Sequence, residues 1–433
     1  MSRILIKEAK EKVSGSVTIA GWVRNLRAHK GLVFIDLVDI SGTMQVVFTA
    51  EQGGYEVAEK LTLESVVEVV GNLQEKPAKK NDPNPVKDFE LAATAARLIS
   101  LADENLPIPV LVKADNEANL DNRFDWRWLD LRRPEHQLIF KVWTKLEEGM
   151  REYFRQNDFT QLYTPCLMST ASESGAEVFA VKYFDRQAYL AQSPQFYKQM
   201  AMAAGLERVF MVGTVFRAEP SFTTRHVTEF TGWDAEVSYA SYSDVMSMEE
   251  DMLIAGFQKV KEDLGLEIEV PAKPFPKITL AVAKEKLKAA GIKSEKNDDF
   301  STEEEKMLGE IIKKENGHDF VFVTDYPITA RPFYHMRHED NSELTKSFDL
   351  IYRGLEITTG AEREHRLDVL EKQAQEKGMN LDELKDYLNF FRYGCPGHSG
   401  LGIGPARIIM KMLNLGSVKE ACFLPRDVKR LTP

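Results

Sequence analysis

A charged loop between two runs of alternating apolar residues carries arginines that could bind phosphate. The first run ends at Arg217, and Arg225 and His226 lead into the second run near Phe230. Two alternating runs joined by a charged loop predict a β-hairpin. Arginine suits phosphate because its planar guanidinium donates two parallel hydrogen bonds and keeps its charge. Any one of these charges alone would be ordinary surface charge, so the predicted polyphosphate site depends on the cluster.

A second group of polar residues precedes this hairpin. Ser193, Gln195 and Lys198 surround Pro194, and apolar residues at helical spacing follow them. Proline is favoured at the start of a helix. The segment therefore predicts polar side chains held at the start of a rigid helix.

Oxygen-bearing side chains gather in the C-terminal third of the chain. Asp349, Glu356 and Thr359 lie on a stretch that alternates like a buried strand. Hard oxygen ligands suit magnesium, which usually keeps several waters and bridges a protein to phosphates. Taken alone, this spacing is a weak signal for a metal site.

A glycine-rich run, GCPGHSGLGIGPAR, ends in Arg407 at the predicted start of a helix. Glycine lets the backbone approach a ligand closely, and a helix start favours anions. A dinucleotide-binding loop is excluded because no βαβ unit with a ribose-binding acid surrounds the run.

The elements that position these residues require more than one domain, because 433 residues are too many for a single core. Five short strands between about residues 17 and 100 predict a small barrel of the oligonucleotide-binding type. Such barrels stack bases on exposed aromatic rings, and Phe34, with Gln45 on the neighbouring strand, is the candidate. Strand alternation alone favours a core position for Phe34. A linker and a long amphipathic helix follow the barrel.

Composition limits the class of protein. The net charge of −11 argues against a protein that coats nucleic acid, although it permits a local basic face. No apolar run reaches the length of a membrane helix, and the first residues lack the apolar centre of a signal peptide, so we expect a cytoplasmic protein without membrane contact. Three cysteines without a C-x-x-C pair predict neither a disulfide framework nor a zinc site.

Several of these segments resemble one enzyme family. FRAE followed by TTRHVTEF is similar to motif 2 of class II aminoacyl-tRNA synthetases, and the glycine-rich run before Arg407 resembles motif 3. AQSPQFYKQ resembles the amino-acid-binding segment of aspartyl-tRNA synthetases, and GWVRNLRAHKGLVFIDLVDISGTMQVV resembles their anticodon-binding domain. The chain is thus identified as a member of that family in its compact archaeal and eukaryotic form, without the larger inserted domain of the bacterial enzymes.

The resemblance implies an α+β fold. It predicts a five-stranded OB-fold barrel over residues 1–104, a linker over 105–135, and a class II catalytic domain over 136–433. The catalytic domain is expected to hold an antiparallel sheet flanked by helices, with a small solvated insertion at about 250–330 to which we assign no chemistry.

The resemblance also implies a reaction: aspartate and ATP, with magnesium, give aspartyl-adenylate, and the aspartyl group passes to tRNA. Arg217 is expected on the α-phosphate and Arg407 on the γ-phosphate, and Lys198 acts with them. The residues expected around ATP are Arg217, Glu219, Arg225, His226, Phe230, Glu356 and Arg407. The residues expected around aspartate are Glu173, Ser193, Gln195, Lys198, Asp234 and Arg363. Asp349, Glu356 and Thr359 are expected to hold magnesium.

Further partners follow from the resemblance. Arg27, Phe34 and Gln45 are expected to contact the anticodon of tRNA(Asp), and acceptance of tRNA(Asn) stays open. The helix at 138–157 and the extended run that is broken at Pro165 are similar to motif 1, which implies a homodimer.

The chain departs from the family pattern at three places. Asp158 replaces a usual glycine, Gly397 a usual proline, and Pro405 with Ala406 a usual Leu-Glu pair. Alternatives from other classes are an aspartate–ammonia ligase, an inactive RNA-binding paralogue, and an unrelated nucleic-acid-binding barrel. The intact barrel speaks against the first, and the phosphate-binding residues against the third.

Overall fold

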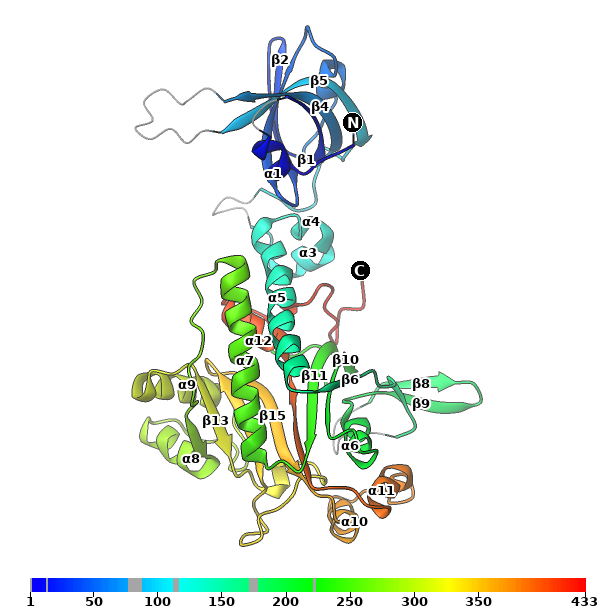
Figure 1. Ribbon diagram of the computed structural model, residues 1–433, viewed down its shortest axis with the longest axis vertical. Helices are drawn as coiled ribbons and strands as arrows, with labels where there is room; N and C mark the ends of the chain where they lie inside the picture. The colour runs from blue at the N-terminus through cyan, green and yellow to red at the C-terminus, as the bar shows by residue number, and fades with distance from the viewer. Residues whose placement is uncertain (1, 13–14, 77–87, 112–116, 171–177, 221–222) are drawn as a thin grey trace. The chain divides into compact units, whose positions relative to one another are not determined.

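The computed structural model describes residues 2–12, 15–76, 88–111, 117–170, 178–220 and 223–433. The chain divides into two compact units, Met1–Arg133 and Pro134–Pro433, whose elements are drawn in Figure 1. Among the described helices, none is both long enough and apolar enough to cross a bilayer.

The first unit contains a closed barrel of five strands in the order β1-β2-β3-β5-β4. Strands β3 and β5 pair in parallel, and the other neighbours pair antiparallel. This arrangement confirms the predicted five-stranded OB-fold. The strands are β1 (Gly15–His29), β2 (Leu32–Asp39), β3 (Gly42–Thr49), β4 (Val66–Glu75) and β5 (Phe89–Ser100), with helices α1 (Ile6–Glu11) and α2 (Tyr55–Ala58) beside them and α3 (Leu120–Asp125) and α4 (Arg127–Asp130) after them.

The pleat of β2 decides where Phe34 lies. Val33, Ile35 and Leu37 are buried in the barrel core, so the alternating positions face outward. Phe34 is therefore half-buried on the outer face, in register with Val47 of β3. This position agrees with the family resemblance and corrects the core position that alternation alone favoured.

The second unit is built on an eight-stranded sheet in the order β12-β13-β14-β15-β16-β11-β10-β6. Its six central strands pair antiparallel, and the two edge strands pair in parallel with their neighbours. The predicted antiparallel sheet is confirmed, with parallel pairs added at both ends. The strands are β6 (Thr160–Leu162), β10 (Arg208–Phe216), β11 (Glu229–Ser238), β12 (Lys277–Thr279), β13 (Phe320–Thr324), β14 (Ser347–Tyr352), β15 (Glu356–Arg363) and β16 (His398–Ile403), and β7 (Leu167–Met168), β8 (Ala180–Tyr183) and β9 (Arg186–Leu190) form a separate small sheet.

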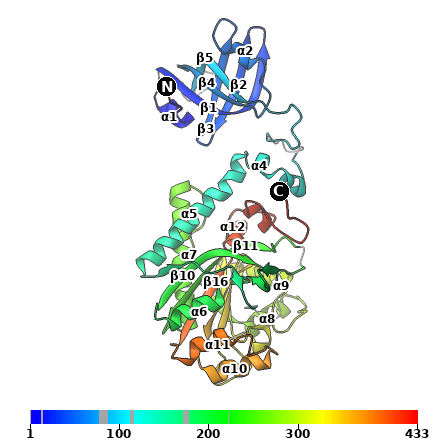
Figure 2. The same cartoon turned by 90° about the vertical axis from the view of Figure 1, so that its right-hand side faces the viewer.

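Helices cover both faces of this sheet, as Figure 2 shows. On one face the main core joins sheet residues to α5 (Pro134–Gln156), α7 (Tyr242–Leu264) and α12 (Pro405–Met412). Alternate residues of β13 turn to the other face, where they pack on α8 (Leu280–Ala289) and α9 (Thr302–Asn316). A further cluster joins α6 (Gln195–Ala203), α10 (Leu367–Glu376) and α11 (Lys385–Arg392).

The local backbone accommodates two of the residues that depart from the family pattern, Asp158 and Pro405. Asp158 adopts a φ of 60°, the left-handed conformation that glycine would adopt without strain, and the strand β6 still begins at Thr160. Pro405 is the first residue of α12, where the missing N–H removes no helical hydrogen bond. Both departures from the family pattern therefore keep the local geometry.

We expect Gly149→Val to destabilise the second unit. A Cβ at Gly149 of α5 would lie 2.4 Å from the carbonyl oxygen of Ala255 and 2.7 Å from the Cα of Gly256, both on α7. Overpacking of this kind costs about 1–3 kcal/mol. Urea unfolding should show the loss, whereas Gly213→Ala, whose new methyl would meet no atom within 4 Å, should change stability little. An unchanged midpoint for Gly149→Val would contradict this packing.

Candidate active site

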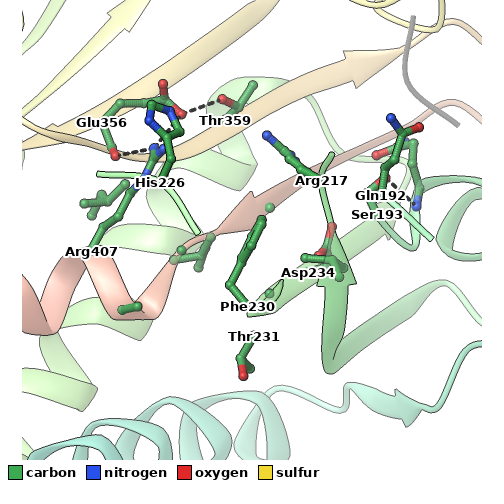
Figure 3. Close-up of a pocket in the computed structure, with 18 of the residues that line it drawn as sticks. Gln192, Ser193, Arg217, His226, Phe230, Thr231, Asp234, Glu356, Thr359 and Arg407 are labelled. Carbon is green, nitrogen blue, oxygen red and sulfur yellow. Dashed lines mark hydrogen bonds and ion pairs between the residues drawn. The ribbon is translucent and has the colours of Figure 1, made fainter. Parts of the chain in front are cut away.

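One cavity of about 400 Å³ in the second unit gathers most of the residues expected from the sequence (Figure 3). It lies against β10, β11, β15, β16 and the starts of α6 and α12. The expected residues on its wall are Ser193, Gln195, Lys198, Arg217, Glu219, Arg225, His226, Phe230, Asp234, Glu356, Thr359, Arg363 and Arg407. Asp349 is buried next to this wall, and Glu173 lies outside the described residues.

Arg217 directly follows the last residue of β10. The β10–β11 hairpin is paired from Arg208 opposite Val237 to Phe216 opposite Glu229, and the Arg217 amide donates to the Thr228 carbonyl at 2.9 Å. The guanidinium carbon lies 5.6 Å from the centre of the Phe230 ring. Within the described residues its N–H groups have no hydrogen-bond partner, so they remain available to a ligand.

Arg225 and His226, the two other basic residues of the hairpin loop, have protein partners. The Nη2 of Arg225 lies 2.5 Å from the Oε2 of Glu305, and its Nη1 lies 2.7 Å from the Oγ1 of Thr302. The Nδ1 of His226 lies 2.6 Å from the Oγ1 of Thr223. Burial, together with the charge of Arg407, lowers the pKa of His226, so its ring is mostly neutral near pH 7.

Glu305 is a site residue that sequence analysis does not identify. It lies in the first turn of α9, within the segment to which we assigned no chemistry. Its Oε2 accepts from Arg225 and also from the backbone N–H of Glu356, at 3.0 Å. The insertion thus supports two walls of the cavity, and its charged composition gave no indication of this contact.

Arg407 reaches the cavity from the first turn of α12. Its Nη1 donates to the carbonyl oxygen of Glu356 at 2.9 Å and lies 3.5 Å from the Oε1 of the same residue. Thr359 also donates to this Oε1, at 3.3 Å, and Figure 3 shows the three side chains together at one end of the cavity. These contacts leave the Glu356 carboxylate partly exposed in the cavity.

The other end of the cavity has a floor of buried charges. Lys198 is 2% exposed, and its Nζ lies 2.8 Å from the Oδ1 of Asp234, 3.0 Å from the Leu401 carbonyl oxygen and 3.4 Å from the Oε2 of Glu236. Arg363, also 2% exposed, donates from Nε to the Oε1 of Glu236 at 3.0 Å. Two cations and two carboxylates therefore form one buried network.

Sequence analysis misses Glu236, although a signal for it exists. Residues two apart on a strand share a face, so Glu236 follows Asp234 into the site, while Trp233 and Ala235 enter the main core. The two cations hold the pKa of Glu236 below its usual value despite complete burial. The spacing Asp-Ala-Glu on an alternating strand could have identified it.

The glycines of β16 make room for these acids. A Cβ at Gly400 would lie 1.9 Å from the Oε2 of Glu236, and one at Gly402 would lie 3.2 Å from the Oδ1 of Asp234. The glycine run was expected to let backbone approach a ligand. In the structure these two glycines instead admit the carboxylates of the neighbouring strand.

The residues expected to hold magnesium lie on neighbouring strands. Asp349 of β14 is directly opposite Thr359 of β15. One Asp349 oxygen pairs with the Nη2 of Arg331 at 2.7 Å, and the other is buried without a hydrogen-bond partner among the described residues. Burial and the nearby Glu356 raise the pKa of Asp349.

This chemistry fits a divalent cation, because two carboxylates repel one another and one oxygen is unsatisfied. Within the described part of the chain, no group of three or more His, Cys, Asp and Glu residues could hold a metal ion by itself. A cation here would therefore share its ligands with water and a bound phosphate. In the structure Arg331, which sequence analysis misses, forms an ion pair with Asp349.

The expected anticodon residues meet on the outer face of the barrel in the first unit. The guanidinium carbon of Arg27 lies 5.9 Å from the centre of the Phe34 ring, and its Nη2 lies 3.5 Å from the Oε1 of Gln45. Gln45 in turn donates to Glu90 of β5 at 2.7 Å. An aromatic ring, an amide and a cation thus share one partly exposed patch.

Comparisons with known proteins agree with both units. A family model described as tRNA synthetases class II (D, K and N) matches residues 119–428, and one described as an OB-fold nucleic acid binding domain matches residues 17–99. The aspartate–tRNA(Asp/Asn) ligase of Aeropyrum pernix is 40% identical, over 99% of this chain and 98% of that protein. The aspartate–tRNA(Asp) ligase of Pyrococcus abyssi is 39% identical, over 98% of each.

Solved structures agree as well. The asparaginyl-tRNA synthetase of Pyrococcus horikoshii, complexed with asparaginyl-adenylate, has a TM-score of 0.90 at 30% identity and covers 100% of both chains. An aspartyl-tRNA synthetase of Entamoeba histolytica has a TM-score of 0.87 at 30% identity, over 100% of this chain and 93% of that one. The chain therefore belongs to the class II tRNA synthetases of the D, K and N family, together with the aspartate–tRNA ligases that it matches over its whole length.

Proposed function

We propose that the protein is an aspartate–tRNA ligase whose active site is the cavity described above. The observation that carries the proposal is the pair of buried cations, Lys198 and Arg363, on the wall of a cavity that also holds Arg217 and Arg407. A buried carboxylate needs a cation or several donors, because desolvation otherwise costs several kcal/mol. The two buried cations thus suit the side chain of aspartate, and the two other arginines suit a triphosphate.

In the first step, a carboxylate oxygen of aspartate attacks the α-phosphorus of ATP, and the bond to pyrophosphate breaks. This reaction needs no strong base, so positioning and charge neutralisation supply most of the catalysis. Arg217 would hold the α-phosphate and Arg407 the γ-phosphate, with His226 and Arg225 beside the distal phosphates. Phe230 would stack on adenine, with Glu219 near its amino group.

Magnesium held by Asp349, Glu356 and Thr359 would neutralise charge on the phosphates. Ser193, Gln195 and Asp234 would bind the ammonium and carboxylate groups of the substrate, and Glu173 would close the site. In the second step a hydroxyl of the terminal adenosine of tRNA attacks the aspartyl carbonyl carbon, and AMP leaves.

The outer patch of the barrel would read the anticodon. We propose that Phe34 stacks on its central base and that Gln45 hydrogen-bonds the same base, with Arg27 beside them. The relatives named above include ligases for tRNA(Asp) and for tRNA(Asp/Asn). Charging transcripts of both tRNAs side by side would decide between the two specificities. We further propose a homodimer that works in the cytoplasm.

Loss of either buried cation should abolish aspartate activation. Lys198→Ala or Arg363→Ala would leave the substrate carboxylate underpaired, and we expect kcat/KM for aspartate in ATP–pyrophosphate exchange to fall by about a hundredfold or more. Lys261→Ala, which removes an exposed lysine of α7, should exchange normally. Near-normal exchange by either pocket variant would refute the assignment of the aspartate site.

The two hairpin arginines should behave differently. Arg217→Ala should lower kcat of exchange by about 10²–10³, since transition-state donors have effects of this size, and should leave the thermal midpoint unchanged. Arg225→Ala should lower the midpoint, because it breaks the contact with Glu305, and should reduce kcat much less. A larger kcat loss for Arg225→Ala would contradict the proposed roles.

Phe34→Ala should separate tRNA binding from amino-acid activation. Loss of one stacked base costs about 1–3 kcal/mol, so KM for tRNA should rise roughly 5- to 150-fold. Aspartate-dependent exchange without tRNA should be unchanged. Ile40→Ala, which removes an apolar side chain that is exposed on the same barrel, is the matched control. An unchanged KM for tRNA in Phe34→Ala would place the anticodon elsewhere.

A further inference from the structure

His335 is a buried histidine on the wall of the cavity, and the proposed function gives it no role. It is 2% exposed and lies on the segment between the 3-10 helix η1 (Ile328–Ala330) and β14. This segment forms a bridge in which His335 is opposite Arg363. The histidine therefore lies beside one of the two buried cations proposed to bind the substrate.

Backbone hydrogen bonds fix the position of this ring. The amide of Met336 donates to the Glu362 carbonyl at 2.9 Å, and the amide of Glu364 donates to the Tyr334 carbonyl at 2.9 Å. The side chain of Gln373 donates to the carbonyl of His335 itself at 3.1 Å. The imidazole is thus attached to the end of β15 rather than to a mobile loop.

The contact between the ring and Arg363 assigns the tautomer. The Nη1 of Arg363 lies 3.1 Å from the Nε2 of His335. Because a guanidinium has no acceptor, the Nε2 lone pair must accept, and the proton of a neutral ring must lie on Nδ1. That Nδ1 is buried and has no hydrogen-bond partner among the described residues. The fold therefore directs the Nε2 lone pair of His335 at Arg363 and leaves the Nδ1–H without an acceptor among the described residues. A buried donor without an acceptor costs free energy of folding.

The surrounding charges keep the ring neutral. Burial holds the pKa of His335 well below its usual range, and the nearby cations Arg363, Arg331, Lys198 and Lys377 lower it further. The carboxylate nearest to this pair is Glu236, which lies at the opposite side of the Arg363 guanidinium, on Nε.

Arg363 is consequently held from two sides by different kinds of acceptor. Glu236 supplies a charged acceptor at Nε, and His335 supplies a neutral one at Nη1. The Nη2 group has no hydrogen-bond partner among the described residues. A second acid in place of the imidazole would cancel the charge that a substrate carboxylate needs, whereas a neutral acceptor fixes the guanidinium and leaves that charge available.

We infer that His335 is a positioning residue for the substrate: its neutral imidazole fixes Arg363 so that the Nη2 edge faces the side-chain carboxylate of a dicarboxylic amino acid. This inference rests on the proposed function, because it assumes that Arg363 binds that carboxylate. It adds a residue that sets affinity for the amino acid without affecting ATP.

The test compares His335→Leu, which has no acceptor, with His335→Gln, which keeps a neutral one. A hydrogen bond to a charged group supports roughly a 10- to 150-fold effect, so His335→Leu should raise KM for aspartate at least about tenfold. KM for ATP should stay within about twofold, because the ring contacts Arg363 rather than the arginines proposed to bind phosphate. His335→Gln should keep KM for aspartate within about threefold of the parent, and His318→Leu, a histidine outside the cavity, should match the parent.

A pH profile gives a second readout. The unperturbed pKa of a histidine side chain is about 6.5. With a neutral His335, KM for aspartate of the parent enzyme should be flat between about pH 6 and pH 8. A step near the middle of this range that disappears in His335→Gln would show a protonated ring and overturn the inference.

The outcomes separate the inference from the proposed function. No aspartate-dependent exchange by the parent enzyme would refute the function itself. If the parent enzyme exchanges normally and His335→Leu has an unchanged KM for aspartate, the inference alone is refuted. An equal rise of KM for aspartate and KM for ATP in His335→Leu, with a lower thermal midpoint, would also refute it, because it would show general damage to the fold. If His335→Leu does not fold, a rise above about tenfold in His335→Gln refutes the inference, and a value within threefold supports it.

Discussion

The buried pairing of Lys198 and Arg363 with Asp234 and Glu236 is the interaction on which the second unit depends. Each cation is 2% exposed, and an unpaired charge at such a position would not be tolerated in a stable fold. The four side chains come from α6, β11 and β15, so the network requires the sheet and the helix to be assembled first. It therefore links the architecture of the domain directly to the cavity in which we propose that aspartate binds.

Strand pleating separates this network from the apolar core. Alternate residues of β11 face the cavity and the main core, which lets one strand line the cavity and pack the core together. Glycines of β16 complete the arrangement, because any side chain at position 400 would collide with Glu236. The buried charge network thus depends on small residues in a neighbouring strand as much as on the charged residues themselves.

Distant parts of the chain support the cavity wall around Arg225 and Glu356. Glu305 on α9 holds Arg225 and the backbone of Glu356, and Arg331 holds Asp349. Arg217 keeps its hydrogen-bond donors unpaired within the described residues, while its neighbours are engaged. A ligand would therefore meet one open guanidinium in a wall whose other charges are already oriented, which reduces the reorganisation needed during reaction.

The sequence by itself determined the elements and most residues of the site. Alternation predicted the β10–β11 hairpin, the proline at position 194 marked the start of α6, and family motifs identified Lys198, Arg217, Arg363 and Arg407. Tertiary structure alone decided the counter-ion Glu236 and the positions of Glu305, Arg331 and His335. Local patterns record the period of a strand or helix, whereas partners more than a hundred residues apart, such as Glu236 and Arg363, are chosen by the register of the folded sheet.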